Sequence, residues 1–370
     1  MKSKISIICL SPYLGGMELD ALKLADLLSL EFEISLCLRA DSLLHSHVLQ
    51  QSKIDCKNKF SIKTFKFFSN FSLPLIWRLR RFFCLEKVNI LIVFGSSELK
   101  AIIPASLGLG IGLINLHGTN KNVFKKSLFH RLIYSKINAH IALSKTLLEN
   151  IKFILPIYNH QILRVIPNYF SIIDNVIKDE QRSNNIEIIH VGRIVPGKGQ
   201  WEALLAFKFA MAFNSNIKIS FVGSVEDEVY YSKINEFLLE NEMQKFVTFL
   251  GFQKDVNYFL KDANVFLYPS YGEGLPGVVF QAFSFGIPIL CFENTVFPEL
   301  LETGFSFCMV ENLNQEKLNH GLKKILEDLA SQKKLALNNI QIMKDFFSKE
   351  KVLVRWKDLI SEVIEKLNKS

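Results

Sequence analysis

The sequence contains 370 residues, of which 49% are hydrophobic and 22% are charged, and its formal net charge is +8. A chain of this length and apolar content can bury the cores of two ordinary domains, which excludes an intrinsically disordered protein. Its 6 cysteines show no Cys-x-x-Cys spacing, so we expect buried free thiols in a reducing compartment and neither disulfides nor a zinc site.

The first half of the sequence alternates apolar runs with helical patterns. The run from Ile5 to Leu10 is too short for the apolar core of a secretory signal peptide and predicts a buried strand. Gly15 and Gly16 lie in the following loop, before a helix expected from about Met17 to Leu30. Further strands are predicted at Phe32–Leu38, Asn89–Phe94, Gly112–Leu116, His140–Ser144 and Leu163–Pro167. This alternation predicts a parallel sheet with helices on both faces, in a first domain over residues 1–170.

The longest stretch without charged residues runs from Ala101 to Asn120. Pro104 and several glycines interrupt it, and its end is polar, which predicts a helix, a turn and a strand. No transmembrane helix is therefore expected.

His117 lies at the carboxyl end of one predicted strand. Open parallel sheets bind ligands at this edge, so the residue is a candidate for a ligand pocket. A lone histidine in such a place is more often structural, and that alternative stays open.

The second half begins with a polar run, Asp174 to Asn185, that predicts a linker or a solvated loop. Strands are then predicted at Ile186–Val191, Ile217–Gly223, Val247–Gly251, Val265–Tyr268, Ile289–Phe292 and Phe305–Val310. A closing helix is predicted because apolar residues recur there at spacings of three and four, namely Val352, Trp356, Leu359, Ile360, Val363 and Leu367. We expect a second domain over residues 171–348 and a terminal helix over residues 349–370.

One candidate site follows the first strand of the second domain. Arg193 and Lys198 lie five residues apart between Gly192 and Gly199, just before a helix expected from about Gln200. A guanidinium fork, an ammonium group and a helix N-terminus can together bind a diphosphate. Two solvated surface cations are the commoner explanation of such a pair taken alone.

The second candidate site is the glycine-rich stretch from Ser270 to Pro288. Its glycines allow backbone amides to approach a ligand, and Pro276 suits the first turn of a short helix expected over residues 278–285. Glu273 lies in this loop and is either a helix cap or a polar group that faces a hydroxylated ligand.

Together these motifs resemble those of the family-four retaining glycosyltransferases of the GT-B fold, especially members that build bacterial surface polysaccharides. The resemblance extends over most of the chain and is most specific between about residues 186 and 300. It implies an α/β protein with two Rossmann-like parallel-sheet domains that face an interdomain cleft, the first on the acceptor side and the second binding the nucleotide sugar. It also implies that the helix over residues 349–370 crosses back to the first domain.

The resemblance assigns roles to individual residues. Gly192, Arg193, Lys198 and Gly199 match the family motif that binds the donor diphosphate, and Glu273 matches the first glutamate of a Glu, seven residues, Glu motif that holds the sugar and the ribose. The second position of that motif is Gln281 here, which departs from the family pattern.

Other positions are assigned by their context in the family. Gly274 and Leu275, beside Glu273, fall on the donor side, as does the double glycine Gly15 and Gly16. His117 matches a histidine near the transferred sugar. No Asp-x-Asp motif occurs, so neither a metal nor another cofactor is expected.

Positive charge is concentrated in the first domain. Up to residue 170 the sequence has 22 Lys and Arg against 10 Asp and Glu, whereas the remainder has 22 against 26. Much of the excess is interleaved with aromatic residues in Phe60 to Lys87 and Lys121 to Lys136, which predicts docking on an anionic membrane surface. A solvated helix face is the alternative, and no nucleic-acid-binding module is present, so nucleic acid is not an expected partner.

The resemblance and the charge pattern together predict a retaining glycosyltransferase, of the hexosyltransferase class. Its expected substrates are a nucleotide-sugar donor and a lipid-linked, lipopolysaccharide or polysaccharide acceptor. Its expected location is cytoplasmic and peripheral, on the inner face of the cell membrane. Two alternatives remain open, a nucleotide-sugar epimerase of the same fold and, because of Gln281, an inactive donor-binding subunit.

Overall fold

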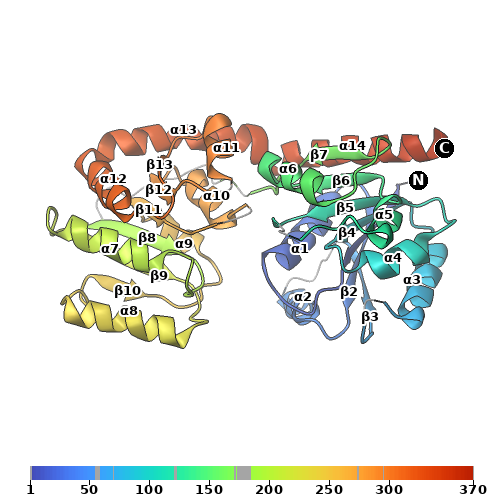
Figure 1. Ribbon diagram of the computed structural model, residues 1–370, viewed down its shortest axis with the longest axis horizontal. Coiled ribbons are helices and arrows are strands. Elements are labelled where there is room, and N and C mark those ends of the chain that lie inside the picture. Colours follow the sequence, from blue (N-terminus) through green and yellow to red (C-terminus); the bar gives the residue numbers. More distant parts are fainter. Residues whose placement is uncertain are drawn as a thin grey trace. The chain divides into compact units, whose positions relative to one another are not determined.

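The computed structural model describes residues 2–54, 59–69, 71–120, 123–170, 172, 185–272, 275–294 and 296–369. The chain divides into two compact units (Figure 1). The first unit combines Met1–Tyr169 with Lys349–Ser370, and the second contains Phe170–Ser348. The predicted linker, Asp174 to Asn185, lies outside the described residues except for Asn185.

The first unit is built on a parallel sheet that has seven strands among the described residues, in the order β3-β2-β1-β4-β5-β6-β7. The strands are β1 Lys4–Cys9, β2 Glu33–Arg39, β3 Ser61–Phe65, β4 Ile90–Phe94, β5 Gly112–His117, β6 Ala139–Ala142 and β7 Ile162–Val165. The helices are α1 Gly16–Leu28, α2 Leu43–Ile54, α3 Leu73–Glu86, α4 Leu99–Ser106, α5 Leu128–Tyr134, α6 Lys145–Ile154 and α14 Lys349–Lys369. All residues of β4, β5 and β6 are buried, as expected for strands covered on both faces.

Strand β3 is the one element of this sheet that the sequence pattern does not reveal. Its sequence, SIKTF, is mostly polar, and only Phe65 is buried. The strand pairs with β2 at the sheet edge, where a strand has less apolar surface to cover. Weak burial therefore leaves a weak sequence signal.

Helix α14 packs within the first unit, although it is the last element of the chain. Its apolar face, including Trp356 and Val363, is buried. Ion pairs from Arg164 to Glu362 at 2.7 Å and from Lys349 to Asp26 at 2.9 Å add polar contacts within the unit. These exposed pairs are worth about 0–1 kcal/mol each, so burial of the apolar face dominates the attachment.

The second unit repeats the parallel architecture, with six strands among its described residues in the order β10-β9-β8-β11-β12-β13. The strands are β8 Ile186–Val191, β9 Ile217–Val222, β10 Val247–Phe249, β11 Val265–Tyr268, β12 Ile289–Phe292 and β13 Cys308–Val310. The helices are α7 Gln200–Met211, α8 Glu228–Glu240, α9 Asn257–Leu260, α10 Gly277–Ser284, α11 Phe297–Glu302, α12 Gln315–Glu327 and α13 Leu329–Phe347. The expectation of parallel α/β sheets in both halves is confirmed.

Phenylalanines dominate the core on one side of the second sheet. The ring of Phe170 stacks on Phe280 with centroids 4.6 Å apart, and Phe283 stacks on Phe305 at 4.4 Å. Each buried ring contributes roughly 1.5–3 kcal/mol through apolar burial alone. This core fixes α10, the helix that follows the glycine-rich loop, against the sheet.

Two further observations bear on the composition of the chain. The described cysteines are all free thiols, of which Cys84 is exposed and Cys9, Cys37 and Cys291 are buried. None of the described helices is both long and apolar enough to cross a membrane.

Candidate functional site

The two motif loops of the second unit follow neighbouring strands. One loop follows β8 and the other follows β11, and these two strands pair in the sheet. Strand order reverses between them, since β9 lies on the other side of β8 and β12 lies on the other side of β11. The carboxyl edge at such a switch point is where open parallel sheets bind ligands.

The two loops are in direct contact. The carbonyl oxygen of Gly197 accepts a hydrogen bond from the backbone N–H of Tyr271 at 3.0 Å and a longer one from the Ser270 hydroxyl at 3.4 Å. Asn294, in the loop after β12, donates to the carbonyl oxygen of Ser270 at 2.6 Å. The loops after three neighbouring strands, β8, β11 and β12, are therefore joined by hydrogen bonds.

Glycines make this close approach possible. Gly199 has a φ of +85°, and a Cβ there would lie 2.2 Å from the carbonyl oxygen of Pro269. At Gly223, after β9, a Cβ would lie 2.0 Å from the carbonyl oxygen of Gly192. Any side chain at either position would force the backbones apart.

Two buried polar side chains form hydrogen bonds to the backbone of the loop after β8. The Nε2 atom of His190 lies 2.9 Å from the carbonyl oxygen of Lys198. The Nε2 atom of Gln200 donates to the carbonyl oxygen of Arg193 at 2.8 Å. Both side chains are fully buried, so the backbone that carries the two cations is fixed by the interior of the unit.

Arg193 is exposed and forms an ion pair with Glu226 at 2.7 Å, the two side chains being 60% and 42% exposed. Exposed pairs of this kind contribute about 0–1 kcal/mol, so a phosphate group can replace the carboxylate at low cost. Lys198 is half-buried in the same loop. Helix α7 begins directly afterwards, and no side chain caps its N-terminus at Gly199.

The glycine-rich stretch is described in part. Helix α10 begins at Gly277, one residue earlier than predicted, and Pro276 is its N-cap, whereas the sequence placed Pro276 in the first helical turn. Leu275 packs against the phenylalanine core, and Gln281 is half-buried on α10. Glu273 and Gly274 lie outside the described residues.

The double glycine of the first unit lies at the start of α1. Gly15 is the N-cap and Gly16 the first helical residue. The Glu18 carboxylate accepts a hydrogen bond from the backbone N–H of Gly15 at 3.0 Å. This is half of a capping box, so a side chain of the protein occupies part of the anion-binding capacity of this helix end.

His117 ends β5 and is 8% exposed. Its Nε2 atom lies 3.1 Å from Nδ1 of His140 on the adjacent strand β6. Burial lowers the pKa of His140 to about 4, so this partner is neutral near pH 7. The pair fixes the ring of His117 from within the sheet, which is compatible with a structural role and with a role at the strand end.

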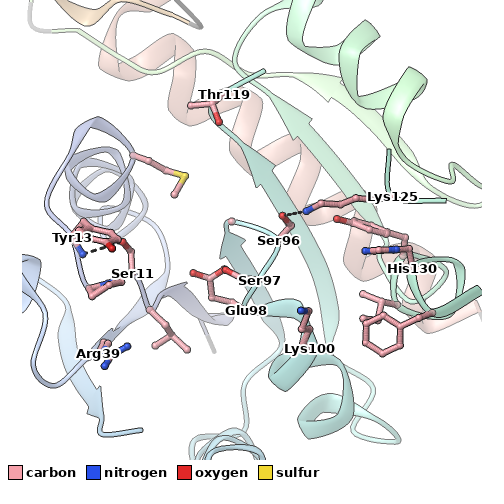
Figure 2. Close-up of a pocket in the computed structure, with 17 residues that line it drawn as sticks. Ser11, Tyr13, Arg39, Ser96, Ser97, Glu98, Lys100, Thr119, Lys125 and His130 are labelled. Carbon is pink, nitrogen blue, oxygen red and sulfur yellow. Dashed lines mark hydrogen bonds between the residues drawn. The ribbon is translucent and has the colours of Figure 1, made fainter. Parts of the chain in front are cut away.

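The first unit also contains a pocket of about 460 Å³ that the sequence analysis did not identify. It lies beyond the carboxyl ends of β1, β2, β4 and β5, and α5 forms a further wall. Figure 2 shows Lys125 and His130 on one side, Ser11 and Tyr13 on the other, and Glu98 between them. The only signal in the sequence was that part of the lining follows strand ends, because no motif links these residues.

Among the described residues, no group of three or more His, Cys, Asp or Glu side chains is placed to hold a metal ion.

Comparison with known proteins identifies related sequences. Residues 173–341 match the family model described as Glycosyl transferases group 1. The capsular polysaccharide biosynthesis glycosyltransferase CapH of Staphylococcus aureus is 28% identical over 72% of this chain and 75% of that protein. An uncharacterized glycosyltransferase of Methanocaldococcus jannaschii is 28% identical over 54% of this chain and 58% of its own length. The chain spans about half the length of several of the curated relatives that it matches.

A solved structure shares the fold over nearly the whole chain. The crystal structure of Anabaena HepE in complex with UDP and glucose has a TM-score of 0.75 at 18% identity, and the match covers 97% of this chain and 100% of that chain. At this identity the likeness establishes the fold alone. The second unit therefore resembles the group 1 glycosyltransferases, and the chain has the GT-B fold.

Proposed function

We propose that this protein is a retaining hexosyltransferase that moves a sugar from a nucleotide-sugar donor to a lipid-linked, lipopolysaccharide or polysaccharide acceptor. The observation that carries the proposal is the direct contact between the loops after β8 and β11, one of which bears Arg193 and Lys198. The likeness to CapH, which is named for capsular polysaccharide biosynthesis, supports the acceptor class.

The chemistry that these loops can perform is stabilisation of a leaving diphosphate. Cleavage of the donor leaves negative charge on the diphosphate oxygens, and groups that meet this charge as it develops lower the barrier. In our proposal Arg193 exchanges Glu226 for a phosphate oxygen, Lys198 supplies a second cation, and the N-terminus of α7 adds its amides. No metal is required for this step, and the nucleotide sugar is a substrate.

The remaining residues are proposed to position the sugar and the nucleoside. Glu273 would hold the transferred sugar through its hydroxyls, and His117 would contact the sugar from the first unit. Gln281 would bond the ribose, while Gly274 and Leu275, with Gly15 and Gly16, would shape the donor side. Retention of the sugar's configuration fits a reaction in which the acceptor attacks from the face that the phosphate leaves. The leaving phosphate then helps to deprotonate the acceptor.

We also propose that the first unit docks on the anionic inner face of the cell membrane, with the protein cytoplasmic. Phe68 and Phe71, before α3, are 98% and 64% exposed, and Trp77 on α3 is 60% exposed. The guanidinium of Arg81 lies 5.5 Å from the centroid of the Trp77 ring. Mixed cationic and aromatic surfaces of this kind suit a lipid interface.

Not every cation of this segment is available for docking. Arg78 donates to the carbonyl oxygen of Lys66 at 3.0 Å. Arg80 donates to the carbonyl oxygen of Leu107 at 2.7 Å, which ties α3 to the end of α4. These two arginines support the fold, so in our proposal Arg81 and the exposed aromatic residues make the membrane contact.

Calorimetry with UDP, GDP and ADP tests the donor site. Arg193→Ala and Lys198→Ala should each weaken binding of the preferred nucleotide by about 1.5–3 kcal/mol, or roughly 10- to 150-fold. Glu226→Gln should leave binding unchanged or tighten it by about fivefold at most, because the competing pair is lost. Lys317→Ala is the matched control, since Lys317 also forms an exposed 2.7 Å pair, with Glu311.

Equal nucleotide affinity in the wild type and in Lys198→Ala would contradict the assignment of the diphosphate site. Product analysis with donor alone separates a transferase from an epimerase, since only the epimerase changes the donor sugar without an acceptor. Absence of turnover with every donor and acceptor tried would favour an inactive donor-binding subunit.

A further inference from the structure

Tyr271 joins the loop after β11 to helix α7. Its hydroxyl donates a hydrogen bond to Oε1 of Glu202 at 2.5 Å, although the two residues are 69 positions apart in the chain. Glu202 lies in the first turn of α7, the helix that follows Arg193 and Lys198. A side chain of one motif loop is therefore bonded to the helix that follows the other motif loop.

The backbone of Tyr271 is held by the loop after β8. Its N–H donates to the carbonyl oxygen of Gly197 at 3.0 Å. Its ring lies beside the same glycine, because a Cβ at Gly197 would be 3.8 Å from Cδ2 of Tyr271. Gly197 directly precedes Lys198. Tyr271 is thus attached at two points, through its backbone to the loop that carries the cations and through its hydroxyl to the following helix.

Glu202 belongs to a helix turn that is itself fixed. The side chain of Gln315, at the start of α12, donates to the carbonyl oxygen of Glu202 at 3.1 Å. The backbone N–H of Trp201 donates to the hydroxyl of Tyr230 on α8 at 3.0 Å. Because two neighbouring helices hold the first turn of α7, the bond from Tyr271 connects the glycine-rich stretch to a fixed part of the unit.

The Tyr271 hydroxyl keeps its proton near neutral pH and can therefore act as the donor. Burial raises its pKa, and the hydrogen bond to the Glu202 carboxylate and the charge of that carboxylate raise it further. A bond from a hydroxyl to a carboxylate is charge-assisted and stronger than a bond between two neutral groups. Tyr271 is 42% exposed, so water competes with this bond and reduces its contribution.

A glutamate in the first turn of a helix has a common explanation of its own. Its charge interacts favourably with the helix dipole, and this effect does not require Tyr271. In α7, however, the carboxylate lies in the turn that is proposed to bind a diphosphate, and like charges repel. The contact with Tyr271 accounts for a carboxylate at this place. The two explanations predict different results when both side chains are changed together.

We infer that Tyr271 and Glu202 are positioning residues, whose hydrogen bond holds the start of the glycine-rich stretch against the loop after β8. The inference rests on the proposed function, because Glu273, which is proposed to hold the transferred sugar, follows Tyr271 by two positions. Two residues span at most about 7 Å, so fixing Tyr271 limits where Glu273 can lie. Arg193 and Lys198 do not take part in this bond. The bond therefore acts on sugar transfer and not on nucleotide affinity.

Amide hydrogen exchange tests the contact without any substrate. Tyr271→Phe and Glu202→Ala should each lower the protection factor of the amide at position 271 by about three- to thirtyfold, because this is the amide bonded to Gly197. Glu202→Gln keeps an acceptor oxygen and should stay within about threefold of the wild type. Tyr271→Phe combined with Glu202→Ala should add little to either change alone, since both remove the same bond.

Another tyrosine of the same unit provides the matched control. Tyr258, on α9, is 61% exposed. Tyr258→Phe removes a hydroxyl without touching the bond between Tyr271 and Glu202. It should leave the protection factor at position 271 unchanged.

Kinetics and calorimetry separate positioning from nucleotide binding. Tyr271→Phe should lower kcat for sugar transfer roughly tenfold, because even a small misplacement of an active-site group lowers the rate. The affinity for UDP should change by less than about threefold, because the cations keep their places. Glu202→Gln should retain most of the wild-type kcat, whereas Glu202→Ala should not.

Each contrary result has a distinct meaning. Unchanged protection at position 271 in both Tyr271→Phe and Glu202→Ala would overturn the inference. Additive losses in the double variant would also overturn it and favour the helix dipole as the reason for Glu202. Parallel losses of kcat and UDP affinity in Tyr271→Phe would overturn the positioning role and make Tyr271 a nucleotide ligand. Calorimetry of Lys198→Ala reports on the donor site separately, so a failed donor site and a failed positioning contact are told apart.

Discussion

The two units have similar parallel sheets and yet build their candidate sites in different ways. In the second unit, backbone segments touch. Glycine is required at Gly199 and Gly223 because a Cβ there would lie about 2 Å from a backbone carbonyl oxygen. In the first unit, the pocket is lined by side chains from several strand ends and from α5. A site made by backbone contact constrains sequence in a recognisable pattern, whereas a site made by scattered side chains can change its ligand by single substitutions.

The largest expected effect comes from the backbone contact in the second unit. Gly199→Ala should destabilise this unit by at least about 3 kcal/mol and abolish nucleotide binding, because its Cβ meets a backbone carbonyl oxygen. Gly251→Ala is the control, since Gly251 has a φ of +64° and nothing within 4 Å of the added Cβ. It should cost only about 1–2 kcal/mol for the left-handed backbone.

Amide hydrogen exchange in β8 and β11 measures the loss of stability, and calorimetry measures the loss of nucleotide binding. Similar losses in the two variants would show that the left-handed backbone, and not the contact with Pro269, determines the effect.

The buried histidine of the first unit should give the next largest effect. The pKa of His140 is about 4 in the folded protein against 6.5 ordinarily, because burial disfavours the charged ring. The unfolded chain therefore binds more protons between these values, and stability that is fully present above pH 6.5 is lost as the pH falls through 4. The total loss is about 3 kcal/mol.

Hydrogen exchange in β5 and β6 as a function of pH measures this loss. His140→Gln should remove most of the slope between pH 6.5 and 4. A slope unchanged in that variant would assign the acid sensitivity of the unit to other groups.

The smallest expected effect concerns Gln281, where the family pattern has a glutamate. A glutamine offers one neutral acceptor and an amide donor, and neutral bonds are weaker than charge-assisted ones by about 1 kcal/mol. Gln281→Ala should therefore weaken nucleotide binding several-fold, and Gln281→Glu should tighten it or leave it unchanged. Calorimetry with the preferred nucleotide tests this prediction. Gln341→Ala is the control, because the Gln341 side chain donates a hydrogen bond to Asp345 on the surface of α13. If Gln281→Ala binds as well as the wild type, this residue does not contact the ribose.

The same contrast explains how much the sequence predicted. Apolar runs located all six strands described in the second unit. The central strands β11 and β12 are buried throughout, and strands buried on both faces carry continuous apolar residues. The edge strand β3 was not predicted, because only Phe65 of its residues is buried. The loops after β8 and β11 were recognised by their glycines, and their contact with each other is a finding of the structure.

The pocket residues could not be predicted in the same way. Lys100, Lys125 and His130 come from different segments, and their proximity depends on how α4 and α5 pack beside the sheet. The charge count predicted that the first unit is basic, but it did not separate Arg80, which bonds backbone carbonyl oxygens, from Lys125, which faces a pocket. Side-chain partners that are distant in sequence leave no periodic signal.

The placement of α14 has a consequence for the synthesis of the chain. The second unit is an insertion within the first, and its two ends are joined by a hydrogen bond from the N–H of Phe170 to the carbonyl oxygen of Phe347 at 2.9 Å. Insertions with adjacent ends commonly fold independently. During translation the second unit can therefore finish folding while the first unit still lacks α14. The apolar surface that later receives Trp356 and Val363 stays uncovered until α14 leaves the ribosome, so the nascent first unit exposes apolar surface after the second unit can have covered its own.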